Sequence, residues 1–154
     1  MKSRTPKGIA FGFIAVWLMF IVAASVPALW ASSAQNANSS AAARPYDEKA
    51  DAAKDLSVAL KSARLNHKRV LVDFGANWCP DCIVLSKIFE EDSVKPFLES
   101  NFVVVKVDVG RFNKNLDIVK KYGNPIGKGI PAVVVLDPGE KVMASTSGGE
   151  LSNP

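Results

Sequence analysis

The sequence of 154 residues has few of the side chains that bind metals or cofactors. It contains two cysteines, Cys79 and Cys82, and a single histidine, His67. Structural zinc needs four ligands, so these three residues do not form a zinc site, and we predict no metal. No glycine-rich phosphate-binding loop occurs, and we therefore expect no organic cofactor. Met143 is the only methionine after residue 34, so the cysteine pair has no methionine cluster near it.

From Tyr46 onward, the sequence also lacks an excess of positive or negative charge. The formal net charge of +4 comes from Lys2, Arg4, Lys7 and Arg44, because from Tyr46 onward there are 15 basic and 15 acidic residues. Proteins that bind nucleic acid normally carry a basic patch or stripe. We therefore expect no nucleic-acid partner.

The sequence has one long apolar run, from Gly8 to Ala31, and basic residues precede it. A basic region before an apolar run is typical of an export signal, and cleavage after Ala34 is the favoured interpretation. The run is also long enough to span a bilayer. An uncleaved anchor would still place the C-terminal domain outside the cytoplasm, by the positive-inside rule.

These patterns divide the chain into three parts. We predict a signal peptide or N-terminal membrane anchor over residues 1–34 and a flexible linker rich in Ser, Ala and Asn over residues 35–45. Residues 46–154 then form one domain of ordinary size. We expect this domain to be exported, most simply to a bacterial periplasm, either soluble or anchored to the inner membrane.

Both cysteines lie in the stretch Trp78-Cys79-Pro80-Asp81-Cys82, directly after the apolar run Val70–Phe74. The run predicts a buried strand, and the stretch after it predicts the start of a helix. A Cys-x-x-Cys pair at such a junction favours thiol–disulfide chemistry, because its sulfurs can bond within one helical turn. Cys79 would lie at the helix N-terminus, which stabilises a thiolate, and is the predicted nucleophile; Cys82 is the predicted resolving thiol.

The remaining periodicity predicts further helices and strands. A helix from Asp47 to about Asn66 would have Asp47 as its N-cap. The other predicted elements are a helix from the cysteines to about Glu91, a turn over Ser93–Leu98, a central parallel strand over Phe102–Val109, a helix over Asn113–Tyr122 stopped by Gly123, and a hairpin of Ala132–Asp137 with Lys141–Ser145.

Two stretches carry a resemblance to a known family. Val72–Cys82 resembles the active-site sequence of the thioredoxin superfamily, and Gly129–Asp137 resembles that family's cis-proline loop and the strand after it. The resemblance runs from roughly Asp47 to Gly149. It implies an α/β thioredoxin-like fold with a central mixed β-sheet flanked by helices, and a redox-active Cys79–Cys82 disulfide. The C-terminal helix that normally closes this fold has no counterpart in the sequence after Ser145.

The resemblance also assigns roles around the cysteines. Asp73 matches the family's buried acid, which takes and returns the proton of Cys82; the competing interpretation is an acid on an outward strand face. Lys106 resembles a lysine near that acid, or is an ordinary surface lysine. Trp78 resembles the tryptophan that flanks the active site and contacts substrates, although it could equally pack in the core.

The same resemblance makes Pro131 a cis proline facing Cys79, with the backbone of Ile130 pairing with an extended substrate segment. Pro80 suits the first turn of a helix and limits how the second sulfur approaches the first. Asp81 places a negative charge beside the pair. This charge should raise the pKa of Cys79 and make the couple more reducing, against the effect of the helix terminus.

These observations predict an exported thiol:disulfide oxidoreductase of the thioredoxin-like interchange type, acting more in the reducing direction. Its expected partners are protein thiols or disulfides and a membrane-bound or soluble dithiol protein that donates or accepts electrons. Two alternatives remain open. The thiols could hold copper(I) in a copper-binding or metallochaperone protein, since soft thiolates suit that ion, or the cysteines could be merely structural.

Overall fold

The computed structural model describes residues 44–151. The predicted signal peptide or anchor and most of the predicted linker lie outside the described residues. Within residues 44–151, no helix is both long enough and apolar enough to cross a membrane.

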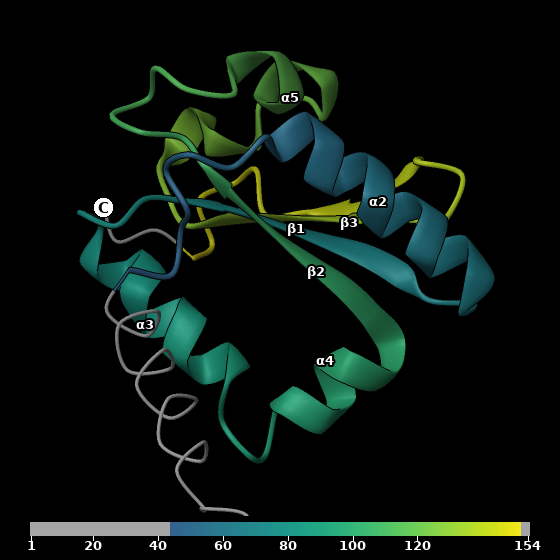
Figure 1. Ribbon diagram of the computed structural model, residues 1–154. Coiled ribbons are helices and arrows are strands. Elements are labelled where there is room, and N and C mark those ends of the chain that lie inside the picture. Colours follow the sequence, from purple (N-terminus) through teal and green to yellow (C-terminus); the bar gives the residue numbers. More distant parts are fainter. Residues whose placement is uncertain (1–43, 152–154) are drawn as a thin grey trace, which may run out of the picture. The chain divides into compact units, whose positions relative to one another are not determined.

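The described chain contains helices and strands, and the strands form one mixed sheet (Figure 1). The elements are α2 (Ala52–Leu65), β1 (Arg69–Gly75), α3 (Pro80–Phe89), α4 (Lys95–Asn101), β2 (Phe102–Asp108), α5 (Leu116–Lys121), the 3-10 helix η1 (Pro125–Lys128), β3 (Ala132–Leu136) and β4 (Val142–Ser145). The strand order is β2-β1-β3-β4. β1 is parallel to β2 and antiparallel to β3, which is antiparallel to β4. The predicted α/β architecture with a mixed sheet is confirmed.

Helices cover both faces of the sheet: α2 and α5 lie on one side, and α3 and α4 on the other (Figure 1). On β1, Val70, Val72 and Phe74 pack into the main core together with the buried side of α2. Because side chains alternate along a strand, Asp73 points to the opposite face, the one that α3 covers. Burial on both faces explains why the sequence of β1 is apolar almost throughout.

Two predicted helix starts are wrong. α2 begins at Ala52 and not at Asp47, because Asp51 is its N-cap and accepts the backbone N–H of Lys54 at 3.0 Å. Asp47 instead accepts the N–H of Lys49 at 2.8 Å, in a turn before the helix. The helix expected from Asn113 begins only at Leu116, since Asn115 has a φ of 52° and a left-handed residue does not continue an α-helix.

β2 was predicted as a central strand, which is wrong for the described sheet. Its parallel pairing with β1 is confirmed, yet it lies at an edge of the four described strands. Only one face of β2 is well buried: Val105 and Val107 pack into the core, whereas Val104, on the other face, is 37% exposed. The predicted hairpin of β3 and β4 is present, and from Thr146 to Leu151 the chain forms turns.

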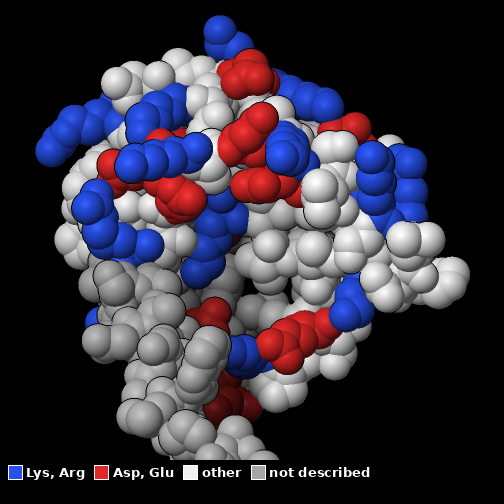
Figure 2. All heavy atoms as spheres, in the orientation of Figure 1, with Lys and Arg blue, Asp and Glu red and all other residues white. Residues whose placement is uncertain are grey.

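Charged side chains do not gather by sign on the face shown in Figure 2, where acidic and basic residues are interspersed. This agrees with the equal numbers of acidic and basic residues from Tyr46 onward. That face therefore has no continuous basic surface of the kind that attracts a polyanion.

Candidate active site

The cysteine pair lies where β1 ends and α3 begins. Cys79 is the N-cap of α3, and Pro80 occupies its first turn, where a missing N–H is tolerated. Cys79 and Cys82 form a disulfide with 5.3 Å between their Cα atoms. The Sγ atom of Cys79 also accepts the backbone N–H of Cys82 at 3.2 Å. This N–H and the N-terminus of α3 would stabilise a thiolate on Cys79 in the reduced protein.

The loop before β3 lies against Cys79. The Ile130–Pro131 peptide bond is cis, as the resemblance implies. The carbonyl oxygen of Ile130 lies 3.6 Å from the Sγ atom of Cys79. The pairing of Phe74 with Ala132 brings this loop to the cysteines, because it sets the start of β3 beside the end of β1. Ile130 and Pro131 are therefore placed where a group bound to Cys79 would meet them.

Trp78 lies at the surface and not in the core, since 45% of it is exposed. Its indole N–H donates to the carbonyl oxygen of Gly110 at 2.8 Å. The ring of Phe112 meets it edge-on, with 6.1 Å between ring centres, and the guanidinium of Arg111 lies 5.4 Å from the Trp78 ring centre. Core packing, the open alternative for Trp78, is excluded. No sequence pattern marks Arg111 or Phe112 as its neighbours.

Asp73 is fully buried, which excludes an acid on an outward, solvated strand face. Its Oδ2 atom accepts the hydroxyl of Tyr46 at 2.9 Å. Its Oδ1 atom is buried and has no hydrogen-bond partner within residues 44–151. Burial raises the pKa of Asp73 to about 7, and the Tyr46 hydrogen bond and the charge of Lys106 limit this rise. A carboxyl with such a pKa can take and return a proton near neutral pH.

α3 packs over the Asp73 side of the sheet with its Cys82 side inward. Cys82 and Ser86 are the buried residues of α3, and positions four apart share one side of a helix. Lys106 is the residue opposite Asp73 in the pairing of β1 and β2, and its Nζ atom donates to the hydroxyl of Ser86 at 2.5 Å. Lys106 therefore bridges sheet and helix beside the acid.

Asp81 lies in the first turn of α3 and lines a groove of about 330 Å³ beside the cis proline. The groove is lined by Asp81, Val84, Leu85, Ile88, Pro131, Glu150 and Leu151. The proposed tuning of the couple by Pro80, Asp81 and Lys106 remains a prediction, because position alone does not measure a redox effect.

Tyr46 and Asn77 are also part of the site. Asn77 lies within the stretch Val72–Cys82, but the resemblance assigned no role to either residue. The side chain of Asn77 holds the backbone of Tyr46, accepting its N–H at 3.1 Å and donating to its carbonyl oxygen at 2.7 Å. The sequence signal for them is weak: Tyr46 is an isolated aromatic residue between a polar linker and a helix. His67, the single histidine, is exposed.

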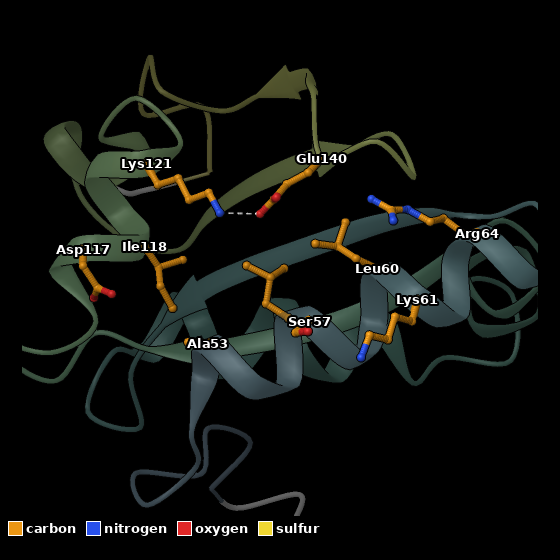
Figure 3. A pocket seen from close by; sticks show the side chains of 10 residues that line it. Ala53, Ser57, Leu60, Lys61, Arg64, Asp117, Ile118, Lys121 and Glu140 are labelled. Carbon is orange, nitrogen blue, oxygen red and sulfur yellow. Dashed lines mark hydrogen bonds and ion pairs between the residues drawn. The ribbon is translucent and has the colours of Figure 1, made fainter.

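A larger hollow elsewhere does not belong to this site. It has a volume of about 550 Å³ and lies between α2, α5 and the β3–β4 turn (Figure 3). An ion pair of Lys121 and Glu140, 2.6 Å long, closes part of its rim. None of the predicted site residues lines it. Among residues 44–151, no three or more His, Cys, Asp or Glu residues cluster closely enough to hold a metal ion.

The family model described as thioredoxin-like matches residues 51–138, which is more than half of the chain. The chain belongs to the thioredoxin-like family. Its mixed sheet with flanking helices is the fold that the sequence resemblance implied. Together with the Cys79–Cys82 disulfide, membership of this family supports thiol:disulfide oxidoreductase activity.

Among the similar solved structures is a disulphide isomerase from Xylella fastidiosa Temecula1. It is 47% identical in sequence, its TM-score is 0.69, and the match covers 71% of this chain and 83% of that chain. Such identity supports a common fold around the cysteine pair.

The curated relatives of this chain include several thioredoxins. Thioredoxin H4 of Arabidopsis thaliana is 33% identical over 86 residues, which cover 56% of this chain and 66% of that protein. A thioredoxin of Rickettsia bellii is 39% identical over 72 residues, covering 47% of this chain and 61% of that protein. The chain thus matches just under two thirds of the length of these two relatives.

Proposed function

We propose that this thioredoxin-like protein is a thiol:disulfide oxidoreductase that exchanges its Cys79–Cys82 couple with partner proteins. The observation that carries the proposal is the disulfide at the N-terminus of α3, with the fully buried Asp73 on the side of the sheet that α3 covers. The similarity to a disulphide isomerase and to thioredoxins supports the same reaction class.

The proposed reaction proceeds through a mixed disulfide. The thiolate of Cys79 attacks a disulfide of the partner, forming a new S–S bond while the partner's other sulfur leaves with the electron pair and takes a proton. Asp73 then accepts the proton of Cys82, whose thiolate attacks the Sγ atom of Cys79. The bond to the partner breaks, the Cys79–Cys82 disulfide forms, and the partner's second sulfur leaves and is protonated. Two electrons pass from the protein to the partner.

The surface around Cys79 fits an extended polypeptide as substrate. We propose that the backbone at Ile130 pairs with it, since the Ile130 carbonyl lies 3.6 Å from the reacting sulfur. Trp78 offers a half-exposed aromatic surface on the cysteine loop. The groove beside Pro131 would receive the continuation of the same segment.

We propose the reducing direction for this exchange. Asp81 adds a negative charge in the first turn of α3, and a negative charge near Cys79 disfavours its thiolate. A couple with a less stable thiolate form is more reducing. A dithiol protein, either in the membrane or soluble, would resupply the electrons. We further propose that residues 1–34 export the protein, most simply to a bacterial periplasm.

The first experiment is a measurement of the reduction potential of the Cys79–Cys82 couple, by equilibrating the full-length chain with a thiol–disulfide redox buffer of known potential. We expect a value near about −270 mV, as in thioredoxin, and catalysis of insulin reduction by dithiothreitol. C79S should abolish catalysis, because no nucleophile remains, whereas C82S should accumulate the mixed disulfide with the partner.

A potential near about −120 mV would overturn the reducing direction and make the protein a disulfide donor. A chain that has no reversible couple and retains copper(I) stoichiometrically on its two thiols would overturn the oxidoreductase proposal itself.

A further inference from the structure

The segment before α2, residues 44–51, is fastened to the loop that carries Cys79. Asn77, two residues before Cys79, bonds the backbone of Tyr46 in both directions, at 3.1 and 2.7 Å. Its amide also donates to the carboxylate of Glu48 at 3.0 Å. From the far side, the Nζ atom of Lys114 donates to the carbonyl oxygen of Glu48 at 3.1 Å. Asn77 and Lys114 thus hold the segment at Tyr46 and at Glu48.

The side chain of Tyr46 passes directly over the end of β1. It is only 1% exposed. A Cβ atom added to Gly75 would lie 2.3 Å from both Cζ and Oη of Tyr46, closer than any real contact. Glycine at this position therefore lets the phenol reach the carboxylate two residues earlier, where its hydroxyl lies 2.9 Å from Oδ2 of Asp73.

The two carboxylate oxygens of Asp73 differ in their hydrogen bonding. Burial, and after it the Asp73 carboxylate, raises the pKa of Tyr46 well above its ordinary value, so the hydroxyl stays protonated and donates to Oδ2. Oδ1 has no partner within residues 44–151. A buried carboxylate is costly unless hydrogen bonds support its charged form. Tyr46 provides one such bond and leaves one oxygen open.

We propose that Tyr46 is a positioning residue for the resolving step: it holds Oδ2 of Asp73 so that Oδ1 accepts the proton of Cys82. This inference rests on the proposed function. In the step, the S–H proton of Cys82 passes to Oδ1, and the resulting thiolate forms the bond to Cys79. The partner's sulfur leaves with the electron pair of the broken bond and is protonated from solvent. The family match begins at residue 51, so Tyr46 lies outside it.

The elements packed against the Asp73 side of β1 bring few other charged or titratable groups. One is Asp108 of β2, which lies opposite Gly75 and is paired with Lys114 at 3.0 Å. Lys106 comes from β2 and lies opposite Asp73 in the strand pairing, and its ammonium donates a hydrogen bond to the hydroxyl of Ser86. Cys82 comes from α3. The residues of β3, Ala132–Leu136, carry no titratable side chain. Tyr46 is therefore the neutral donor to the carboxylate, and removing its hydroxyl changes no net charge at the site.

The test uses Y46F in the full-length chain, which keeps the buried ring and removes only the hydroxyl. Reaction of the reduced protein with dithiobis(nitrobenzoate) forms a mixed disulfide between Cys79 and thionitrobenzoate. Cys82 then attacks Cys79 and releases the coloured thionitrobenzoate in a first-order step. This release isolates the resolving step. Without its hydrogen bond the carboxylate of Asp73 is less stable, so the midpoint of the pH–rate profile should rise by about one pH unit, with release about fivefold slower near pH 7.

A matched control is available in Y122F. Tyr122 is also buried and its hydroxyl donates to a carboxylate, that of Glu140, at 2.7 Å, at the hollow shown in Figure 3 and away from the cysteines. Its pH–rate profile should match that of the wild type. G75A supplies a second test, because its methyl group would push the ring of Tyr46 off Asp73 while the hydroxyl remains in the chain; its midpoint should rise as well.

The two ways of failing are distinguishable. If wild-type protein neither expels the chromophore nor reduces a protein disulfide, the proposed function is wrong. If wild-type protein does both and Y46F keeps the wild-type midpoint, or Y122F moves it equally, the role of Tyr46 is overturned. If Y46F raises the midpoint of the pH–rate profile when Asp73 is present, but has no effect when it is combined with D73N, the effect of Tyr46 acts through the Asp73 carboxylate.

Discussion

Asp73 combines a chemical role with a cost to the fold. It is the one fully buried acid of β1, and burial raises its pKa to about 7 from an ordinary value of 3.8. The folded protein therefore binds a proton at Asp73 more tightly than the unfolded chain does. Across the window from about pH 4 to pH 7, unfolding releases this proton, and the free energy of unfolding falls as the pH rises.

The first prediction at this scale concerns D73N in the oxidised protein, where the thiols do not titrate. The wild type should lose about 4 kcal/mol of stability between pH 4 and pH 8 through Asp73, whereas the variant, with a neutral amide of similar shape, should lose that part of the dependence. Urea denaturation at several pH values measures it. D92N, at an exposed turn residue, is the control and should retain the wild-type slope. A D73N slope equal to the wild-type slope would contradict the assigned pKa.

At the scale of the elements, α2 shows how a helix start depends on geometry beyond composition. Asp47 and Asp51 both precede apolar residues at helical spacing, and both accept a nearby backbone N–H. Only the bond from Lys54 to Asp51 spans the three residues of an N-cap; the bond from Lys49 to Asp47 spans two and belongs to a turn.

The two acids therefore provide a matched pair of variants. D51A should lower the free energy of unfolding by about 1 kcal/mol, because α2 loses its cap. D47A removes an exposed turn contact and should change it by less than about 0.5 kcal/mol. Denaturation by urea at one fixed pH measures both. An equal loss in the two variants would show that the cap does not govern the start of α2.

The elements that carry the cysteines could be predicted because local patterns determine them. The apolar run of β1 and the Cys-Pro-x-Cys start of α3 both lie within a few residues of the reacting sulfurs. The edge position of β2 could not be predicted, since an apolar run indicates that a strand packs against helices but does not show whether it has one or two neighbouring strands. Tyr46 lies 27 residues before Asp73, and no periodicity spans such a contact.

The aromatic surface beside Cys79 has the same non-local origin. Trp78 was identified from the motif, whereas its neighbours Arg111 and Phe112 come from the turn after β2, more than 30 residues along the chain. Phe112 has a φ of 60°, a conformation uncommon for a bulky residue. That backbone conformation places its ring on Trp78 instead of in the core, which no sequence pattern reports.

At the scale of the whole molecule, the charge distribution separates residues 1–45 from the domain that follows. The domain is neutral, and the positive excess lies in Lys2, Arg4, Lys7 and Arg44. The basic residues nearest the N-terminus precede the apolar run, which favours retention of that end in the cytoplasm and export of the domain. A reductant outside the cytoplasm works in an oxidising compartment, so export and the need for an electron donor belong to one proposal.

The full-length chain, fused at its C-terminus to a reporter that is active only after export, tests this arrangement. We expect reporter activity from the full-length chain and none from a fusion that begins at Tyr46, because the second lacks the basic and apolar region. Alkaline extraction of membranes then distinguishes the two forms of the leader: release of a chain shortened by residues 1–34 indicates cleavage, and retention at full length indicates an anchor. Equal reporter activity from both fusions would show that residues 1–34 are not what exports the domain. No activity from either fusion would contradict export and leave the redox chemistry of Cys79 and Cys82 to be sought in the cytoplasm.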